Sequence, residues 1–280
     1  VYALIIKDSL MFAGTMKEGV FCSSDNGKNW SSLINDSTYN NVKCLAIKDS
    51  FIFAGTTTGI LRSTDNCNRW TKISSGPIYW ISSIVIKDNF VFAAMKGGGI
   101  FRSSDNGESW TEINSGLKND FILSLAINEN SIYAGTSGNG VFVSSNNGDS
   151  WAGISNGILS ITVTCCAIRD TSIYVGTSLG GVFLSTDNGA SWSERNSGLF
   201  DLNVLSIALK DSNIFIGTYF SGLFLSTNYG LQWQYIDPYL ANIFANNFII
   251  KDSLIIASTP GSGIFVTTDL GMNWREKNNG

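Results

Sequence analysis

An eight-residue pattern recurs seven times along this chain and constrains its fold more than any other feature. The pattern is Ser/Thr-x-Asp-x-Gly-x-x-Trp, and its third copy runs from Ser103 to Trp110. Successive copies lie 40 or 41 residues apart and end on Trp30, Trp70, Trp110, Trp151, Trp192, Trp233 and Trp274. A period of that length, filled with short β-type runs, is typical of a sheet protein whose units repeat around an axis.

The residue types of the pattern indicate a tight turn between two strands. The Asp carboxylate can accept hydrogen bonds from the backbone N–H groups that follow it, and Gly supplies a positive φ. Trp then opens the next strand, with a large ring to bury and an indole N–H free to find a carbonyl. The acidic position is occupied by Asp25, Asp65, Asp105, Asn146, Asp187, Asn228 and Asp269. Because asparagine still accepts hydrogen bonds, we expect the two Asn copies to be weakened rather than lost.

This pattern resembles the Asp-box, or bacterial neuraminidase repeat, of sialidases, xyloglucanases, sortilin-type receptors and propeller-shaped photosystem II assembly factors. The resemblance covers all seven repeats and therefore essentially the whole chain. It implies an all-β fold, a seven-bladed β-propeller with four antiparallel strands per blade and an Asp-box in each turn between the third and fourth strands. It implies little about function, because the box in that family is a structural turn remote from the ligand face.

Each repeat carries four β-type runs, named A to D, which in the third repeat span 81–87, 90–94, 99–104 and 110–114. The predicted blades of this single domain, 1–280, are 1–40, 41–80, 81–120, 121–161, 162–202, 203–243 and 244–280. Every blade would take its four strands from one repeat. Closure between the first and last blades would then rest on side-chain packing, or on a strand from outside the segment. Because Val1 already lies in a strand pattern, we expect a longer polypeptide.

The two faces of such a ring differ in how uniform their sequences are. Strand direction alternates, so A–B turns and Asp-boxes share one face, the box face, and B–C and D–A connections share the other, the loop face. The A–B turns are nearly uniform, as in Lys48-Asp49-Ser50, whereas the B–C and D–A connections diverge. Loops on a rigid scaffold are the usual binding elements, so the loop face is the predicted site. A ring of cation–carboxylate pairs in the A–B turns is an alternative.

Aromatic residues are the candidate ligand-binding groups of the loop face. They are Tyr39, Tyr79, Trp80, Phe121, Phe200, Tyr219, Phe220 and Tyr239. Rings flanked by Asn and Ser suit sugar stacking or a protein hot spot. The alternative is that half of them pack beneath the loops.

Several kinds of chemistry lack the residues that they need. The chain has no histidine, which removes Ser-His-Asp and Cys-His mechanisms. Its five cysteines, Cys22, Cys44, Cys67, Cys165 and Cys166, show no CxxC spacing, so we expect small buried strand residues, no metal and no cofactor. A glycosidase needs two carboxylates on the ligand face, and few acids are placed there: Glu18, Asp120, Asp201 and, less clearly, Asp36 and Asp237.

Charge and hydropathy argue against two classes of partner, nucleic acid and the membrane interior. The net charge is −4 with no basic tract, which disfavours nucleic acid. No apolar run approaches the roughly 18 residues of a membrane span, so no membrane insertion is expected. The favoured function is a non-catalytic binding or structural module of a secreted or cell-surface bacterial protein, recognising protein or glycan through the loop face. The alternatives are a polysaccharide hydrolase resembling xyloglucanases and an architectural subunit of a surface layer or filament.

Overall fold

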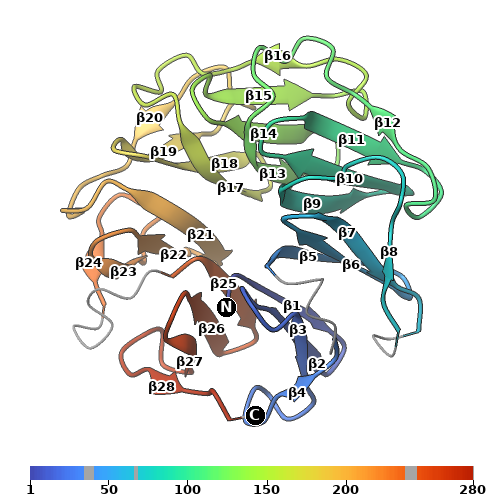
Figure 1. Cartoon of the computed structure of the whole chain (residues 1–280). Coiled ribbons are helices and arrows are strands. Elements are labelled where there is room, and N and C mark those ends of the chain that lie inside the picture. The colour runs from blue at the N-terminus through green and yellow to red at the C-terminus, as the bar shows by residue number, and fades with distance from the viewer. Residues whose placement is uncertain (35–40, 66–68, 237–244, 280) are drawn as a thin grey trace.

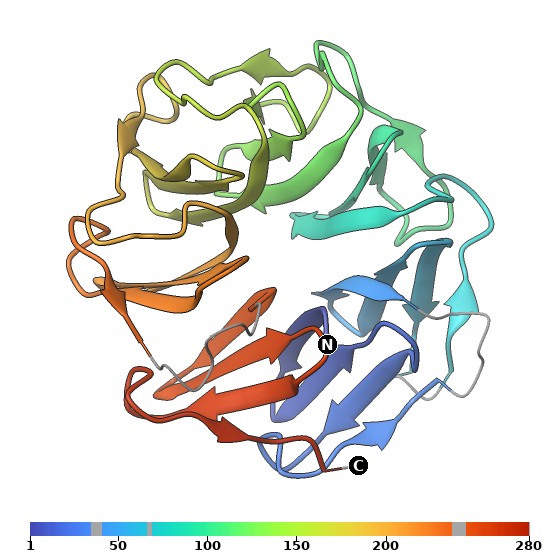
Figure 2. The same cartoon turned by 60° about the vertical axis from the view of Figure 1, so that its left-hand side comes forward.

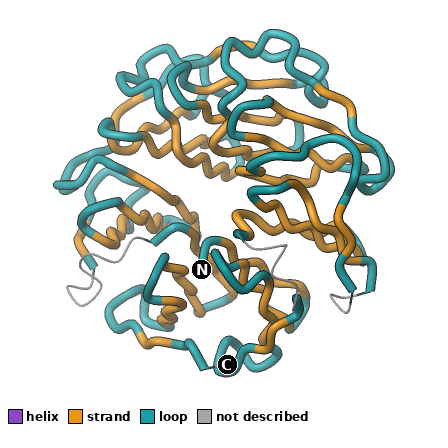
Figure 3. The backbone as a smooth tube through the Cα atoms, viewed as in Figure 1, coloured by secondary structure: helices purple, strands orange, loops and turns teal. Residues whose placement is uncertain are grey.

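A computed structural model describes residues 1–34, 41–65, 69–236 and 245–279 of the chain. Within these ranges the chain forms strands β1 to β28 joined by loops and turns, without a helix (Figure 3). No helix in the described ranges could therefore span a membrane.

The strands form seven four-stranded sheets, and each sheet follows chain order. Blades one and two contain β1 (Ala3–Lys7), β2 (Leu10–Gly14), β3 (Val20–Ser23), β4 (Ser31–Ser32), β5 (Val42–Lys48), β6 (Phe51–Thr56), β7 (Gly59–Ser63) and β8 (Thr71–Lys72). Blades three and four contain β9 (Ile81–Lys87), β10 (Phe90–Met95), β11 (Gly99–Ser103), β12 (Thr111–Glu112), β13 (Ile122–Ile127), β14 (Ile132–Thr136), β15 (Val141–Ser144) and β16 (Ala152–Gly153). Blades five and six contain β17 (Val163–Arg169), β18 (Ser172–Thr177), β19 (Gly181–Ser185), β20 (Ser193–Glu194), β21 (Val204–Lys210), β22 (Asn213–Thr218), β23 (Gly222–Ser226) and β24 (Gln234–Tyr235). Blade seven contains β25 (Asn247–Lys251), β26 (Leu254–Thr259), β27 (Gly263–Thr267) and β28 (Arg275–Glu276).

The sheets stand around one axis, with blade one (blue) beside blade seven (red) (Figures 1 and 2). The first strand of each blade is innermost, and these strands contact one another in sequence around the ring, β25 and β1 included. All pairs within a blade are antiparallel, as in β9, β10, β11 and β12. The predicted seven-bladed propeller with four antiparallel strands per blade is confirmed.

The fourth strand of each blade is shorter than its predicted length. In blade three it covers Thr111–Glu112 rather than 110–114, and one further bond joins the Ile113 N–H to the Ile100 carbonyl at 2.9 Å. The tryptophan before it does not pair within the blade. In blade four, for example, the Trp151 N–H donates to the Ser115 carbonyl of the preceding blade at 2.9 Å.

The hydrophobic core is divided into seven clusters, one at each junction between neighbouring blades. Between blades three and four, Phe92 and Ile113 pack with Ile132 and Trp151. The last cluster joins the ends of the ring and combines Met11 and Trp30 of blade one with Ile256 and Ile264 of blade seven. Sheets that pack face to face in this way bury apolar side chains of both partners.

The closing junction uses backbone hydrogen bonds as well as side-chain packing. The Trp30 N–H donates to the Asn279 carbonyl at 2.9 Å, and the Trp30 indole Nε1 donates to the Lys277 carbonyl at 3.1 Å. The sequence had led us to expect closure by side-chain packing or by a strand from outside the segment. The difference arises because the tail that follows β28 runs alongside the motif of blade one, as the equivalent tails do elsewhere. A cavity of about 190 Å³ remains there, lined in part by Trp30 and Lys277.

A Gly-Thr pair at the end of most second strands shows why the blades fit closely. A Cβ added to Gly55 would lie 2.5 Å from the Cys44 Sγ and 2.6 Å from the Ile81 Cγ2 of the next blade. The following Thr56 hydroxyl donates to the Gly59 carbonyl at 2.8 Å and closes the B–C connection. Glycine is therefore required by packing, and threonine by the turn.

Candidate functional site

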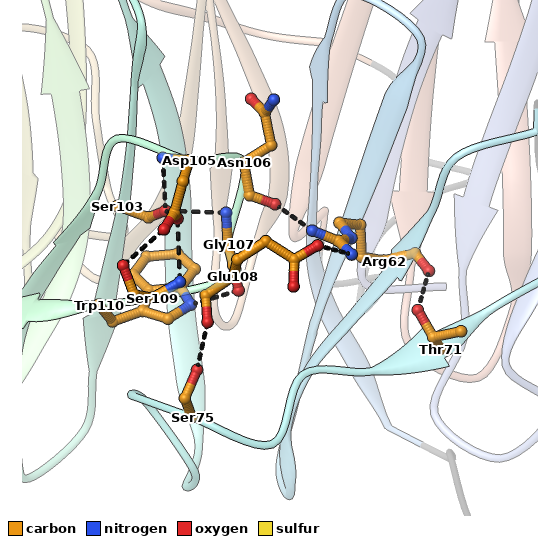
Figure 4. A network of polar contacts seen from close by, with 10 residues as sticks. All are labelled: Arg62, Thr71, Ser75, Ser103, Asp105, Asn106, Gly107, Glu108, Ser109 and Trp110. Carbon is orange, nitrogen blue, oxygen red and sulfur yellow. Dashed lines mark hydrogen bonds and ion pairs between the residues drawn. The ribbon is translucent and has the colours of Figure 1, made fainter.

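The motif copies that the structure describes in full form compact hydrogen-bonded turns, here called box turns, of which the turn from Ser103 to Trp110 is drawn in Figure 4. The Ser103 hydroxyl donates to Asp105 Oδ1 at 2.8 Å and accepts the Gly107 N–H at 2.8 Å. The Ser109 N–H donates to Asp105 Oδ1 at 2.9 Å, and the Ser109 hydroxyl donates to Oδ2 at 2.5 Å. These bonds favour the ionised carboxylate and lower the pKa of Asp105 to about 2, with the Ser109 hydroxyl as the largest cause.

Asparagine preserves this geometry in two box turns. Asn146 Oδ1 accepts the Ser144 hydroxyl at 2.8 Å and the Ser150 N–H at 3.0 Å. Its Nδ2 donates to the Ser150 hydroxyl at 2.9 Å, replacing the acceptor that a carboxylate would present. The hydrogen-bond pattern of the turn is therefore independent of charge.

In four repeats the tryptophan that ends the box turn donates its indole N–H to the preceding blade, whereas the indole N–H of Trp110 donates to the Gly107 carbonyl of its own turn at 3.2 Å. The indole Nε1 of Trp151 donates to the Ile113 carbonyl at 2.7 Å, and that of Trp233 donates to the Arg195 carbonyl at 2.7 Å. Trp192 and Trp30 make the equivalent bonds. The indole N–H groups of Trp70 and Trp274 are buried without a partner in the described part of the chain. The motif thus joins one blade to the next as well as turning the chain.

Charged side chains on the box face also link neighbouring blades. Arg62 of blade two donates to the Asn106 carbonyl at 2.6 Å and pairs with Glu108 at 2.7 Å, both in the box turn of blade three (Figure 4). Arg102 makes the same contacts one blade on, to the Asn147 carbonyl and Asp149.

Four cations of the A–B turns reach backbone carbonyls of the next turn, whereas Lys87 pairs with the carboxylate of Asp88 in its own turn at 2.9 Å, so the predicted alternative of a ring of cation–carboxylate pairs does not describe most repeats. Lys48 donates to the Asn89 carbonyl of the next A–B turn at 2.7 Å, and Lys251 donates to the Asp8 carbonyl across the closing junction at 3.1 Å. Arg169 and Lys210 also donate to carbonyls of the following turn. The Asp that follows each of these cations occupies the left-handed region of a tight turn, with φ of 55° at Asp49.

Exposed apolar side chains gather on the opposite face. Among the described residues, eleven of the fifteen large ones lie in B–C or D–A connections, and the other four lie in box turns. Those of the loop face are Met16, Ile78, Tyr79, Trp80, Phe121, Leu159, Ile161, Leu179, Phe200, Tyr219 and Phe220. The exposed apolar side chains of the described residues are therefore more numerous on the loop face than on the box face.

The predicted aromatic candidates are spread along this face rather than gathered at one point. Tyr39 and Tyr239 lie outside the described residues. The other six are exposed, and Tyr219 meets Phe220 edge to face with ring centroids 4.7 Å apart. Phe200 packs against Phe224, with centroids 4.9 Å apart, yet stays 66% exposed. Of the six, Trp80 lines the pocket described next.

The central channel opens on the loop face into a pocket of about 360 Å³, here called the channel mouth. Each blade contributes the residue at one equivalent position near the start of its first strand; these are Tyr2, Lys43, Ser82, Leu123, Thr164, Leu205 and Asn246. Trp80 and Lys96, from a D–A and a B–C connection, complete the rim. Pockets of this size accommodate small molecules or single side chains of a partner.

Two lysines give the channel mouth its electrostatic character. The Lys43 Nζ lies 3.5 Å from the centroid of the Tyr2 ring, and the Lys96 Nζ lies 5.7 Å from that of Trp80, both within cation–π range. Neither lysine forms an ion pair with a carboxylate of the described ranges. Burial lowers the pKa of both lysines, and repulsion from Lys96 adds to the shift at Lys43.

The loop-face carboxylates do not converge on this pocket. Asp201 is 5% exposed, and its Oδ2 accepts the N–H groups of Phe220 at 2.6 Å and Ser221 at 3.0 Å. It therefore holds two connections of blade six together. Asp120 lines a separate pocket beside Lys118, and Glu18 lines the cavity at the closing junction. Asp36 and Asp237 lie outside the described residues.

The cysteines sit in strands with free thiols at Cys22, Cys44, Cys165 and Cys166. Burial raises the pKa of Cys44 and of Cys165 to about 12, so these thiols are poor nucleophiles. Within the described ranges no group of three His, Cys, Asp or Glu side chains could hold a metal. Cys67 lies outside them.

Sequence reasoning did not find Tyr2, Lys43 or Lys96. A signal was present in the first strands, where the residue before the channel-mouth position is Val, Ile or Ala in every repeat. The residue after it is small or polar, as in Ala3 and Cys44. The channel-mouth position alone changes between aromatic, cationic, aliphatic, hydroxyl and amide side chains. Variation at one position of an otherwise uniform strand could have identified the pocket.

Comparison with known proteins places the chain by its fold. No family model and no curated protein sequence matches it. The GH74 xyloglucanase from Xanthomonas campestris superposes with a TM-score of 0.83 at 14% identity, over 100% of this chain and 54% of that one. The extracellular domain of the putative one component system BT4673 from B. thetaiotaomicron gives 0.79 at 19% identity, over 94% and 37%. The chain thus spans about half or less of the length of these two proteins.

A smaller protein matches over nearly its whole length. YCF48 from Cyanidioschyzon merolae superposes with a TM-score of 0.73 at 14% identity, over 95% of this chain and 94% of that one. YCF48 is also known in a structure bound to D1 peptide, which matches with a TM-score of 0.72. At such identities the likeness shows a shared fold, and function must be argued from the site.

Proposed function

We propose that this chain is a non-catalytic binding module that recognises a protein or a glycan through its loop face. The observation that carries the proposal is the channel mouth, where equivalent positions of seven repeats present different side chains around one pocket. The flanking positions, which pack between blades, stay uniform, so this position is the one that can differ from repeat to repeat and be adapted to a ligand. The box face, in contrast, uses its polar and charged groups to join blades.

The similar structures support this role without defining the ligand. One is the extracellular domain of a putative sensor, and another is a propeller bound to a peptide. We further propose that the chain belongs with Asp-box propellers and serves as part of a secreted or cell-surface protein. The box turns, with a Ser, an Asp or Asn and a Trp in fixed contacts, are what the resemblance requires.

A glycoside hydrolase remains the competing function because a xyloglucanase shares the fold. The site favours binding. Both carboxylate oxygens of Asp201 accept hydrogen bonds from backbone N–H groups, including that of Asn203 at 3.0 Å. The lining of the channel mouth includes no carboxylate within the described ranges. A pair of acids flanking a glycosidic bond is the usual requirement for that chemistry.

A binding screen with matched surface variants tests the proposal. The chain is applied to arrays of glycans and of acidic and neutral peptides, beside a loop-face variant (Trp80→Ala with Tyr219→Ala) and a box-face variant (Tyr229→Ala with Leu231→Ala). All four side chains are exposed, so both variants are expected to fold, as thermal unfolding would verify. We expect the loop-face variant to lose binding and the box-face variant to keep it. The reverse pattern contradicts the proposal, as does turnover of a β-glucan that Asp120→Asn abolishes.

A further inference from the structure

We propose that the channel mouth binds a carboxylate presented by an acidic, partly apolar peptide segment, with the ammonium groups of Lys43 and Lys96 as its charge partners. The inference rests on the proposed function, because it assumes that the loop face is a binding surface. It adds the chemical class of the ligand and the residues that receive it.

The first argument is uncompensated charge. Lys43 is half-buried and Lys96 is exposed, and both lysines face a pocket whose described lining contains no acid. The three ion pairs of the described chain are Arg62 with Glu108, Lys87 with Asp88 and Arg102 with Asp149, all on the box face. A partly desolvated ammonium without a counter-charge is costly to maintain. An anionic ligand would offset that cost.

The second argument concerns which donors are available. The Ser82 hydroxyl donates to the Ile122 carbonyl at 2.7 Å, and the Thr164 hydroxyl donates to the Val204 carbonyl at 2.5 Å, each in the next blade. The Tyr2 hydroxyl donates to the Met16 sulfur at 3.2 Å. These hydroxyls are engaged within the protein, so the two ammonium groups are the charged donors toward a ligand, beside the neutral N–H groups of the Asn246 amide and the Trp80 indole. Charged donors suit a carboxylate better than a neutral sugar hydroxyl.

The third argument separates a peptide from a sugar. Stacking of a sugar needs an open aromatic face, yet in the channel mouth a Lys43 ammonium lies over Tyr2 and a Lys96 ammonium lies on the ring side of Trp80. The wall of the channel mouth also includes the aliphatic side chains of Leu123 and Leu205, while the exposed aromatic rings other than Trp80 lie on loops outside it. Aliphatic surface packs with apolar peptide side chains but offers no flat platform for a pyranose ring. An acidic peptide is therefore favoured over an acidic glycan.

Lysine side-chain NMR tests this directly. Protein labelled with 13C-lysine is titrated with three probes, which are acetyl-Leu-Asp-Leu-Glu with a free carboxyl terminus, its Asn/Gln carboxamide analogue, and trigalacturonate. A bound carboxylate favours the charged ammonium and raises its pKa. We expect the acidic peptide to raise the pKa of Lys43 and Lys96, with no change at Lys28 and Lys72, which lie outside the channel mouth. The carboxamide analogue should have no effect.

Paired charge variants supply the matched control. Lys43→Gln with Lys96→Gln should weaken binding of the acidic peptide about tenfold or more, the effect of losing roughly 1.4 kcal/mol. Lys28→Gln with Lys72→Gln removes the same net charge and should leave affinity within about twofold, since distant exposed charges are screened. If both pairs of substitutions weaken peptide binding equally, the effect comes from net charge alone and the proposal is wrong.

Other outcomes also decide the matter. A response of Lys43 and Lys96 to trigalacturonate that exceeds the response to the peptide would assign the site to a glycan instead. No response to any carboxylate would remove the site. If the array shows that binding depends on Trp80 and Tyr219 but no probe changes the pKa of Lys43 or Lys96, the carboxylate assignment is wrong and the proposed function stands. If the loop-face variant binds normally, the proposed function fails with it.

Discussion

Asp105 shows what a single residue contributes to each repeat. Its carboxylate accepts three hydrogen bonds, two of them from Ser109. Asn146 satisfies the equivalent turn with an amide. The shared requirement is an acceptor at Oδ1; the negative charge strengthens the bonds made there, and the second bond reverses its direction because Asp accepts from the serine hydroxyl and Asn donates to it.

The pH dependence of stability should reflect this difference. The pKa of Asp105 is lowered to about 2 in the folded chain, against an ordinary value of 3.8. A lowered carboxyl pKa contributes stability that is present above the ordinary value and lost as pH falls toward 2. The free energy of unfolding of Asp105→Asn, measured in urea, should lie below that of the natural chain at pH 7 and approach it near pH 2. Asp105→Ala should lose about 1 kcal/mol at pH 7, because its donors can partly turn to water.

An exposed acid outside the box turns serves as the control. Asp120→Asn removes one carboxylate without touching a box turn, so it should not reproduce the pH trend of Asp105→Asn. A stability difference between Asp105→Asn and the natural chain that persists unchanged down to pH 2 would refute the role assigned to the carboxylate.

At the scale of elements, the tryptophan that ends a box turn packs between neighbouring sheets. Trp233 is 2% exposed and Trp30 is 7% exposed, and each donates its indole N–H to a carbonyl of the preceding blade. The two junctions differ in one respect. A covalent connection joins blades five and six, whereas blades seven and one meet without one between them.

This difference predicts unequal consequences for the same substitution. Trp30→Ala and Trp233→Ala should each cost about 3–5 kcal/mol, the usual range for a large buried aromatic side chain. Hydrogen exchange should separate them. Trp30→Ala should accelerate exchange in β1, β2, β26 and β27, because the unlinked blades can part, whereas Trp233→Ala should leave blades five and six associated.

Equal exchange patterns in the two variants would mean that the closing junction is no weaker than the others. A loss below about half a kcal/mol in both would show that the indole does not hold the junction. Trp233→Phe is the conservative comparison, since it keeps most of the apolar ring and removes only the hydrogen bond to the Arg195 carbonyl.

The strands could be predicted because the same pattern of apolar runs and turns occurs in every repeat. The run 81–87 and strand β9 (Ile81–Lys87) coincide, as expected when apolar alternation and the Asp88 turn agree on the same boundary. The fourth strand was overestimated because Trp110 and its equivalents have strong strand propensity. Their N–H groups and rings turn toward the preceding blade, which local propensity cannot reveal.

At the scale of the whole molecule, the contacts that join the blades and the proposed binding site lie on opposite faces of the ring. Box turns, A–B cations and arginines such as Arg62 join blades on one face. The channel mouth and most exposed apolar side chains lie on the other. Seven rigid blades therefore hold seven variable positions at fixed spacing around one opening, which is a preorganised arrangement for binding.

The candidate site was only partly accessible to sequence reasoning. The loop face and Trp80 followed from the divergence of the connections. Lys43 was not predicted because it lies within a first strand. It lines the same pocket as Trp80 only because of how blades two and three are placed around the axis. Asp201 was expected as one of the few loop-face acids, and nothing in the local sequence shows that the N–H groups of Phe220 and Ser221 donate to its carboxylate.

A crystal structure of the chain bound to the strongest ligand from the arrays would test the central claim most directly. The account predicts that the ligand occupies the channel mouth, contacts Trp80 and Lys43, and leaves the seven box turns unchanged. A ligand seated against the box turns, with the channel mouth vacant, would contradict it.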